Sequence, residues 1–179
     1  HEVAGYINWG YFFHAWGFPP RFASIANVHG CDSCRALWLA SFPVEERAQA
    51  AEAMQLFKEA ERMLYSLNGQ FSTYAICRLC EANADGDDLL LDNLRLPLLR
   101  QQTNADSDAP FLCLSDFVRP LASGVKDCAG VFATTIDKQM LTLFTNDPYK
   151  NLLVQTLADR LAEATAEVLH QHVRREMWG

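Results

Sequence analysis

The stretch from Asp147 to Gly179 is the feature that most constrains how this chain can fold. The carboxylate of Asp147 can cap a helix by accepting a hydrogen bond from a free N–H of the first turn, and Pro148 suits the first helical position, where no donor is needed. An apolar stripe follows at spacings of three and four residues, formed by Leu153, Leu157, Leu161, Ala164 and Val168. The pattern predicts one helix of about 40 Å, long enough to span a domain and to have the other elements pack against it.

A second amphipathic helix is predicted over residues 43–67. Glu45 and Glu46 lie in its first turn, where the helix dipole favours negative charge, and Asn68–Gly69 is a typical helix end. Its buried face is expected to comprise Leu56, Phe57, Ala60, Met63, Leu64 and Leu67.

Residues 71–102 predict a β-hairpin followed by a third extended piece. The β-branched and aromatic run FSTYAICRLC is typical of a strand, and NADGDD is a turn centred on Gly86. The aspartates around Gly86 are expected to form a solvated turn, because the twelve-residue pattern of an EF-hand calcium loop is missing. Pro97 favours an edge strand or a break, since it cannot donate to a neighbouring strand.

The remaining segments complete the expected architecture. We expect a polar loop at 103–110, a strand and extended segment at 111–120, a turn and strand at 123–136, and a short amphipathic helix at 137–145. The expected fold is therefore α+β, with an antiparallel β-sheet packed against the long C-terminal helix and the helix of 43–67. We expect residues 1–179 to form one domain.

Composition narrows the classes of function. A net charge of −7 and a pI near 5.1 argue against a nucleic-acid-binding surface, which needs clustered Lys and Arg. No apolar run approaches the ~20 residues of a membrane span, and no signal-peptide pattern opens the chain, so we expect a cytoplasmic protein. Because the sequence starts at His1 instead of Met, we expect residues ahead of it in the gene product.

Several sequence blocks resemble the activation domain of cobalamin-dependent methionine synthase, and they occur in the same order as in that family. The longest is LADRLAEATAEVLHQHVRREMWG, within the predicted C-terminal helix. The others are YINWGYFFHAWG, EAMQLFKEAERML, ANADGDD, LRQQT, LSDFVRPLASGVKDCAGVFA and DPYKNLLVQ. Together they are distributed along the chain from residue 6 to residue 179, which makes the resemblance far more specific than any single motif.

The resemblance implies a role in methionine biosynthesis. In this family the domain binds S-adenosylmethionine and covers a cobalamin-binding domain while a flavodoxin-type reductase supplies an electron to oxidised cob(II)alamin. The resulting cob(I)alamin takes the sulfonium methyl group, which returns the methyltransferase to its active state. The implied partners of this chain are therefore a cobalamin domain and a flavodoxin-type reductase. The implied task of the chain is to position the methyl donor rather than to supply acid–base catalysis.

The resemblance also assigns two residues of this chain to the S-adenosylmethionine site. Asn8 stands where the family usually has Asp, so it keeps an acceptor oxygen but not the negative charge. Glu163, in RLAEATAE, matches a family Glu, and a carboxylate beside a sulfonium cation is electrostatically favourable. From the residues alone, Glu163 could equally be an exposed helical side chain paired with Arg160. We expect the chain to lack the segment that follows Trp-Gly in the family and holds the ligand's carboxylate and adenosine.

Two Cys-x-x-Cys pairs raise the question of a metal or redox site. Cys31 and Cys34 follow His29 in an expected loop, and Cys77 and Cys80 lie in the first predicted strand. The 42-residue gap between the pairs and the strand geometry of the second pair argue against one four-cysteine zinc site, so no metal ligand is assigned. The pair at 31 and 34 is the better candidate for reactivity.

Three hypotheses for the function remain open from the sequence. The chain could be a separate activation module that works in trans with a cobalamin-carrying methionine synthase, or a truncated copy of that domain. It could instead be a non-catalytic interaction module that contacts a cobalamin-domain partner without binding S-adenosylmethionine. It could also be a metal or redox module that uses the cysteine pairs.

Overall fold

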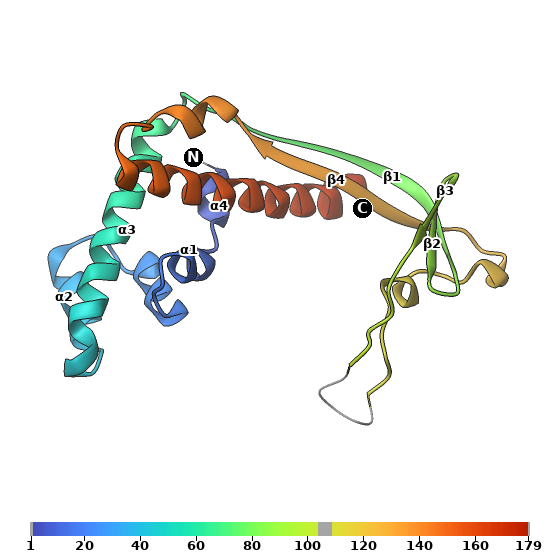
Figure 1. Ribbon diagram of the computed structural model, residues 1–179, viewed down its shortest axis with the longest axis horizontal. Helices are drawn as coiled ribbons and strands as arrows, with labels where there is room; N and C mark the ends of the chain where they lie inside the picture. Colours follow the sequence, from blue (N-terminus) through green and yellow to red (C-terminus); the bar gives the residue numbers. More distant parts are fainter. Residues whose placement is uncertain (1, 104–108, 179) are drawn as a thin grey trace. The chain divides into compact units, whose positions relative to one another are not determined.

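The computed structural model describes residues 2–103 and 109–178 and shows an α+β fold, as predicted (Figure 1). The chain folds into two compact units. Unit 1 comprises residues 1–75 and 134–179, and unit 2 comprises residues 76–133. Most of the expected polar loop at 103–110 lies outside the described residues. No helix among the described residues is both long and apolar enough to cross a lipid bilayer.

The predicted C-terminal helix is present as α4, Pro148–His172, followed by a π-helical turn at Val173–Met177 (Figure 1). The side chain of Asp147 accepts a hydrogen bond from the backbone N–H of Lys150 at 3.1 Å, as a helix cap does. Buried side chains lie on one face of the helix, and Leu161 and Val168 of the predicted apolar stripe are partly buried. The buried side chains of α4 are Leu153, Val154, Leu157, Ala158, Ala164 and Thr165.

The second predicted helix is α3, Arg47–Leu67, preceded by a 3₁₀ turn at Val44–Glu46. It ends where expected: Asn68 turns extended, and Gly69 adopts φ 78°, a conformation that a side chain would strain. Its buried face comprises Ala50, Ala53, Leu56, Phe57, Ala60, Met63 and Leu67.

The N-terminal part of unit 1 is helical and rich in aromatic side chains. It contains a 3₁₀ turn at Val3–Tyr6, helix α1 at Trp9–Ala15, a 3₁₀ segment at Pro20–Asn27 and helix α2 at Asp32–Ala40. Neighbouring rings meet mostly edge to face, the geometry that aromatic quadrupoles favour. The rings in contact are those of Trp9, Phe12, Phe13, Trp16, Phe18, Phe22, Trp38, Phe42, Phe57 and Tyr149.

The expectation that Cys31 and Cys34 lie in a loop was wrong for Cys34, which is in the first turn of α2. Cys31 is the N-cap of that helix, and its Sγ accepts the backbone N–H of Cys34 at 3.3 Å. Trp38 anchors the helix because its ring is buried and its Nε1 donates to the hydroxyl of Ser24 at 2.9 Å. At this N-terminus a thiol takes the capping role that is more usual for Ser or Asp.

The sheet has four strands in the order β3-β2-β1-β4. Strands β1 (Thr73–Asp85) and β2 (Asp88–Leu91) form the predicted antiparallel hairpin, with Gly86 at φ 61° in its turn. Strand β3 (Leu94–Pro97) pairs antiparallel with β2 and is the edge strand that Pro97 predicted. Strand β4, Asp127–Ile136, lies on the other side of β1.

Two further segments differ from their predictions. The strand expected at 111–120 is instead a 3₁₀ turn at Leu114–Phe117, because the carboxylate of Asp116 accepts the N–H of Cys113 at 2.8 Å and closes a capping box. The short helix expected at 137–145 is a 3₁₀ turn at Lys138–Thr142, capped by Asp137. A further 3₁₀ turn lies at Leu121–Ser123.

The hairpin turn is exposed, as predicted, and its aspartates also pair with arginines. Arg95, on β3, contacts Asp85 at the end of β1 at 2.5 Å and Asp88 at the start of β2 at 2.6 Å. Arg100 contacts Asp87 at 2.7 Å and donates hydrogen bonds to both carboxylate oxygens of Asp116 at 2.8 Å. The pairing of Asp116 with Arg100 is the main cause that lowers the pKa of Asp116 to about 2. Arg100, in the LRQQT block, therefore connects the hairpin turn to the 3₁₀ turn at Leu114–Phe117.

Candidate functional site

Asn8 lies immediately before α1 and caps it. Its Oδ1 accepts the backbone N–H of Tyr11 at 3.3 Å. A Cβ atom at Gly10 would lie 3.1 Å from this oxygen, closer than most real contacts, so the glycine keeps the space beside the amide open. The amide oxygen of Asn8 is therefore oriented by the helix it caps.

Glu163 lies in the middle of α4 and is half-exposed. Its Oε2 accepts a hydrogen bond from Nη1 of Arg160 at 2.6 Å, which is the pairing that the i, i+3 spacing allowed. The guanidinium of Arg160 in turn lies over the ring of Tyr11, with Cζ 5.8 Å from the ring centroid.

Asn8 and Glu163 are thus connected through two residues that sequence reasoning did not assign to the site. We call Asn8, Tyr11, Arg160 and Glu163 the α1–α4 surface; all four belong to unit 1. The sequence indicated Arg160 only as a possible ion-pair partner of Glu163. The contact of Tyr11 with Arg160 joins segments that are far apart in the sequence, and no local pattern indicates it.

The α1–α4 surface offers four kinds of contact to a ligand. It has an amide oxygen, a carboxylate, a guanidinium and an exposed aromatic ring, since 57% of Tyr11 is accessible. Such a set suits a zwitterionic ligand that also carries a cationic centre and a flat ring system, because each group has an opposite or stacking partner.

A separate pocket of about 830 Å³ also lies in unit 1. Trp9, Phe57, Phe71, Met140 and Leu161 contribute to its mostly apolar lining. Trp9 follows Asn8 and Leu161 follows Arg160 in the chain, so α1 and α4 contribute residues to both the pocket and the α1–α4 surface. Its volume is within the range of pockets that hold small molecules.

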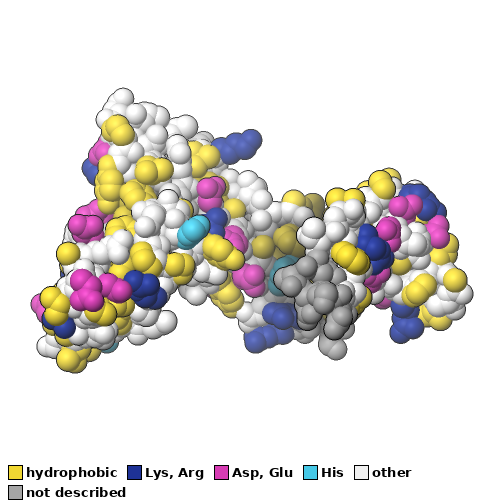
Figure 2. Space-filling model, turned by 60° about the horizontal axis from the view of Figure 1, so that its bottom comes forward, with side chains coloured by type: hydrophobic (Ala, Val, Ile, Leu, Met, Phe, Trp, Pro, Cys, Tyr) yellow, Lys and Arg dark blue, Asp and Glu magenta, His cyan; other side chains and the backbone are white. Residues whose placement is uncertain are grey.

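Charged side chains of both signs are interspersed with hydrophobic ones on the face drawn in Figure 2. Acidic groups there lie beside basic groups. This distribution agrees with the acidic composition and offers no extended basic area on that face for a phosphate backbone.

Comparison with known proteins identifies the family. The family model described as "Vitamin B12 dependent methionine synthase, activation domain" matches residues 1–179. The chain belongs to this family.

A solved structure supports the same assignment. The crystal structure titled "Crystal Structure of the MetH Reactivation Domain bound to AdoHcy" is similar to this activation domain, with a TM-score of 0.74 and 32% sequence identity. The match covers 99% of this chain and 53% of the other, so the activation domain described here spans about half the length of that structure.

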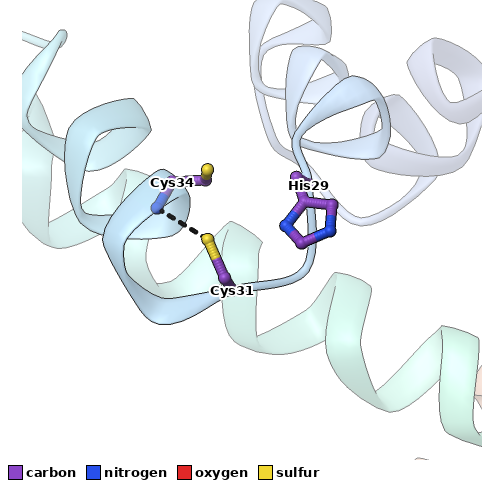
Figure 3. Close-up of side chains that lie close together, drawn as sticks. All are labelled: His29, Cys31 and Cys34. Carbon is purple, nitrogen blue, oxygen red and sulfur yellow. Dashed lines mark hydrogen bonds between the residues drawn. The ribbon is translucent and has the colours of Figure 1, made fainter.

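The cysteines of this activation domain fall into different environments. Cys80, on β1, is buried, and burial is the main cause that raises the pKa of its thiol. In the described parts of the chain, the one group of three or more potential metal ligands is His29, Cys31 and Cys34 (Figure 3). It includes neither Cys77 nor Cys80. The pKa of Cys31 is lowered to about 7, with the neighbouring imidazole of His29 as the largest cause, followed by contacts with Cys34.

Proposed function

We propose that this chain binds S-adenosylmethionine and supports reductive methylation of cobalamin on a methionine synthase, either within one polypeptide or in trans. The observation that carries the proposal is the α1–α4 surface, where Tyr11 meets Asn8 through its backbone N–H and Arg160 through its ring, and Arg160 pairs with Glu163. The family membership and a similar structure bound to AdoHcy support it.

The side chains of the surface fit the chemistry of S-adenosylmethionine. Glu163 would face the sulfonium or the ammonium group, and Arg160 would face the ligand's carboxylate. The exposed ring of Tyr11 would offer a surface for adenine to stack on. When bound, the ligand supplies the methyl group, and the residues of this chain orient it toward a cobalamin domain held by the partner.

The proposed partners follow from the same chemistry. A cobalamin-binding domain would accept the methyl group, and a flavodoxin-type reductase would supply the electron. Positioning alone can accelerate such a transfer, because it turns an encounter of two molecules into a nearly intramolecular step. We propose a cytoplasmic location for the same system.

Calorimetric titration with S-adenosylmethionine tests the proposal, with S-adenosylhomocysteine as a ligand of uncharged sulfur. We expect Glu163→Gln to weaken S-adenosylmethionine binding about fivefold and S-adenosylhomocysteine binding less. Glu167→Gln is the matched control, because Glu167 is an exposed glutamate on the same helix. The absence of binding heat at millimolar ligand would refute direct binding of the methyl donor by this chain.

A second candidate function has one specific observation in its favour. The amide oxygen of Asn8 and the carboxylate of Glu163 both have intramolecular partners already, in Tyr11 and Arg160. A ligand has to compete with these contacts, whereas a protein that only docks on a cobalamin-domain partner does not. If this second function holds, the chain binds the cobalamin domain with the same affinity in the presence and absence of S-adenosylmethionine.

A further inference from the structure

The side chains of His29, Cys31 and Cys34 converge at the start of α2 (Figure 3). Each offers one ligand atom, and these three atoms all lie within 4.8 Å of one another. The three residues come from a single six-residue segment, so their closeness depends on local geometry alone.

The local backbone holds this geometry in two ways. Cys31 is extended, with φ −76° and ψ 154°, and its Sγ accepts the N–H of Cys34, which places Cys34 one helical turn away on the same side. The segment is also fixed at both ends, by the buried Phe22 and Ile25 before it and by Trp38 after it. An N–H donated to a thiolate sulfur is the kind of supporting contact that orients metal ligands.

We propose that His29, Cys31 and Cys34 bind one Zn²⁺ ion, with the fourth coordination position open to a solvent or exogenous ligand. Two thiolates and an imidazole suit zinc rather than the hard cations Mg²⁺ and Ca²⁺, which prefer oxygen. Two thiolates also neutralise the two charges of the metal. The proposal does not depend on the proposed binding of S-adenosylmethionine.

The distances are compatible with a tetrahedral site. Zinc–sulfur bonds of about 2.3 Å and zinc–nitrogen bonds of about 2.1 Å place tetrahedral ligand atoms roughly 3.5 to 3.8 Å apart. Movements of about 1 Å would therefore bring the three atoms into place. The side chains of His29 and Cys31 are exposed, which leaves room for such movements and for the fourth ligand.

The test uses the whole chain, reduced and stripped of metal, then incubated with Zn²⁺ and separated from unbound ion by gel filtration. We expect one zinc per chain by atomic emission. Loading with Co²⁺ instead is expected to give the visible bands of a tetrahedral site and a thiolate-to-metal charge-transfer band. Each of Cys31→Ser, Cys34→Ser and His29→Asn is expected to weaken the metal affinity roughly tenfold or more.

Two matched controls separate this site from other thiols and imidazoles. Cys77→Ser removes a cysteine of the other pair, and His14→Asn removes an exposed histidine of α1; neither is expected to change metal binding. In the unmodified chain, Zn²⁺ is expected to protect Cys31 and Cys34 from alkylation, as mapped by mass spectrometry, which tests the site without any variant.

Three outcomes would overturn the proposal. One is a reduced chain that retains no zinc. Another is bound zinc that survives Cys31→Ser and Cys34→Ser in chains that keep their circular dichroism spectrum. The third is a Cys31–Cys34 disulfide that forms on mild oxidation in a chain that binds no metal when reduced, which would make the pair a redox couple instead.

Discussion

At the scale of single residues, Asn8 carries an amide at a position where the resemblance implies a carboxylate. The amide keeps the capping contact with Tyr11 but brings no negative charge to the α1–α4 surface. Glu163 is then the one carboxylate among the four residues of that surface, and it already forms an ion pair with Arg160.

Restoring a carboxylate at position 8 should therefore strengthen binding of a sulfonium ligand. Asp is as good a helix cap as Asn, so Asn8→Asp should leave α1 intact. We expect S-adenosylmethionine to bind about fivefold more tightly, or ~1 kcal/mol for an exposed ion pair, and S-adenosylhomocysteine to gain less. Titration calorimetry measures both ligands. An equal gain for the two would show that the sulfonium charge does not lie near residue 8.

Asp116 gives a prediction about pH. Its pKa of about 2 in the folded chain lies below the ordinary value of 3.8, with the ion pair to Arg100 as the main cause. A carboxyl group whose pKa is lower in the folded than in the unfolded state stabilises the fold at pH values above its unfolded pKa. This stabilisation is lost as the pH falls through the folded-state pKa. We expect Asp116→Asn to lower the melting temperature at pH 5 and above, with the difference from wild type shrinking between about pH 4 and pH 2.

Asp159→Asn controls for the loss of one negative charge, because Asp159 is exposed on α4. The melts should be followed by far-ultraviolet circular dichroism. A difference between Asp116→Asn and wild type that stays constant down to pH 2 would show that the Arg100 ion pair does not account for the effect.

At the scale of elements, the N-cap of α4 is the clearest target. Asp147 accepts the N–H of Lys150 and contacts its ammonium at 3.2 Å, and the backbone hydrogen bond is the main cause of its lowered pKa. We expect Asp147→Ala to destabilise the chain by about 1 kcal/mol in urea unfolding. Asp159→Ala, in the exposed interior of the same helix, should change stability less; an equal loss would mean that the cap adds little.

The helices were predictable because their signals are local. The cap at Asp147, the Asn68–Gly69 end and the apolar stripes all act within a few residues. The turn at Leu114–Phe117 was missed because a capping box there overrides a strand-like composition. Helix α2 was missed because its cap is Cys31, a residue type that the capping preferences do not favour.

The candidate site was predictable in part for the same reason. Asn8 and Glu163 came from the resemblance, and the Arg160–Glu163 pair follows from helical spacing. The packing of Arg160 on Tyr11 depends on how α1 and α4 meet, which no local pattern contains. His29 was seen beside the first cysteine pair, but its closeness to both thiols depends on the start of α2, which was not predicted.

At the scale of the whole molecule, the proposed ligand site belongs to unit 1. Saturation with S-adenosylmethionine at 100 times its dissociation constant should stabilise the fold by about 2.7 kcal/mol. In hydrogen exchange we expect the added protection to be strongest in peptides of α1 and α4. Glu163→Gln at the same ligand concentration should reduce it, and protection confined to residues 76–133 would place the ligand elsewhere.

The division into two units has a consequence for optical measurements. All four tryptophans and all five tyrosines lie in residues 1–75 and 134–179, and residues 76–133 contain neither. Intrinsic fluorescence and absorbance at tryptophan wavelengths therefore report on unit 1. A melt followed by fluorescence would therefore not report on the β1–β2 hairpin or on the ion pairs of Arg95 and Arg100. A mismatch between that melt and one followed by circular dichroism would be the direct sign that the two units lose their structure at different temperatures.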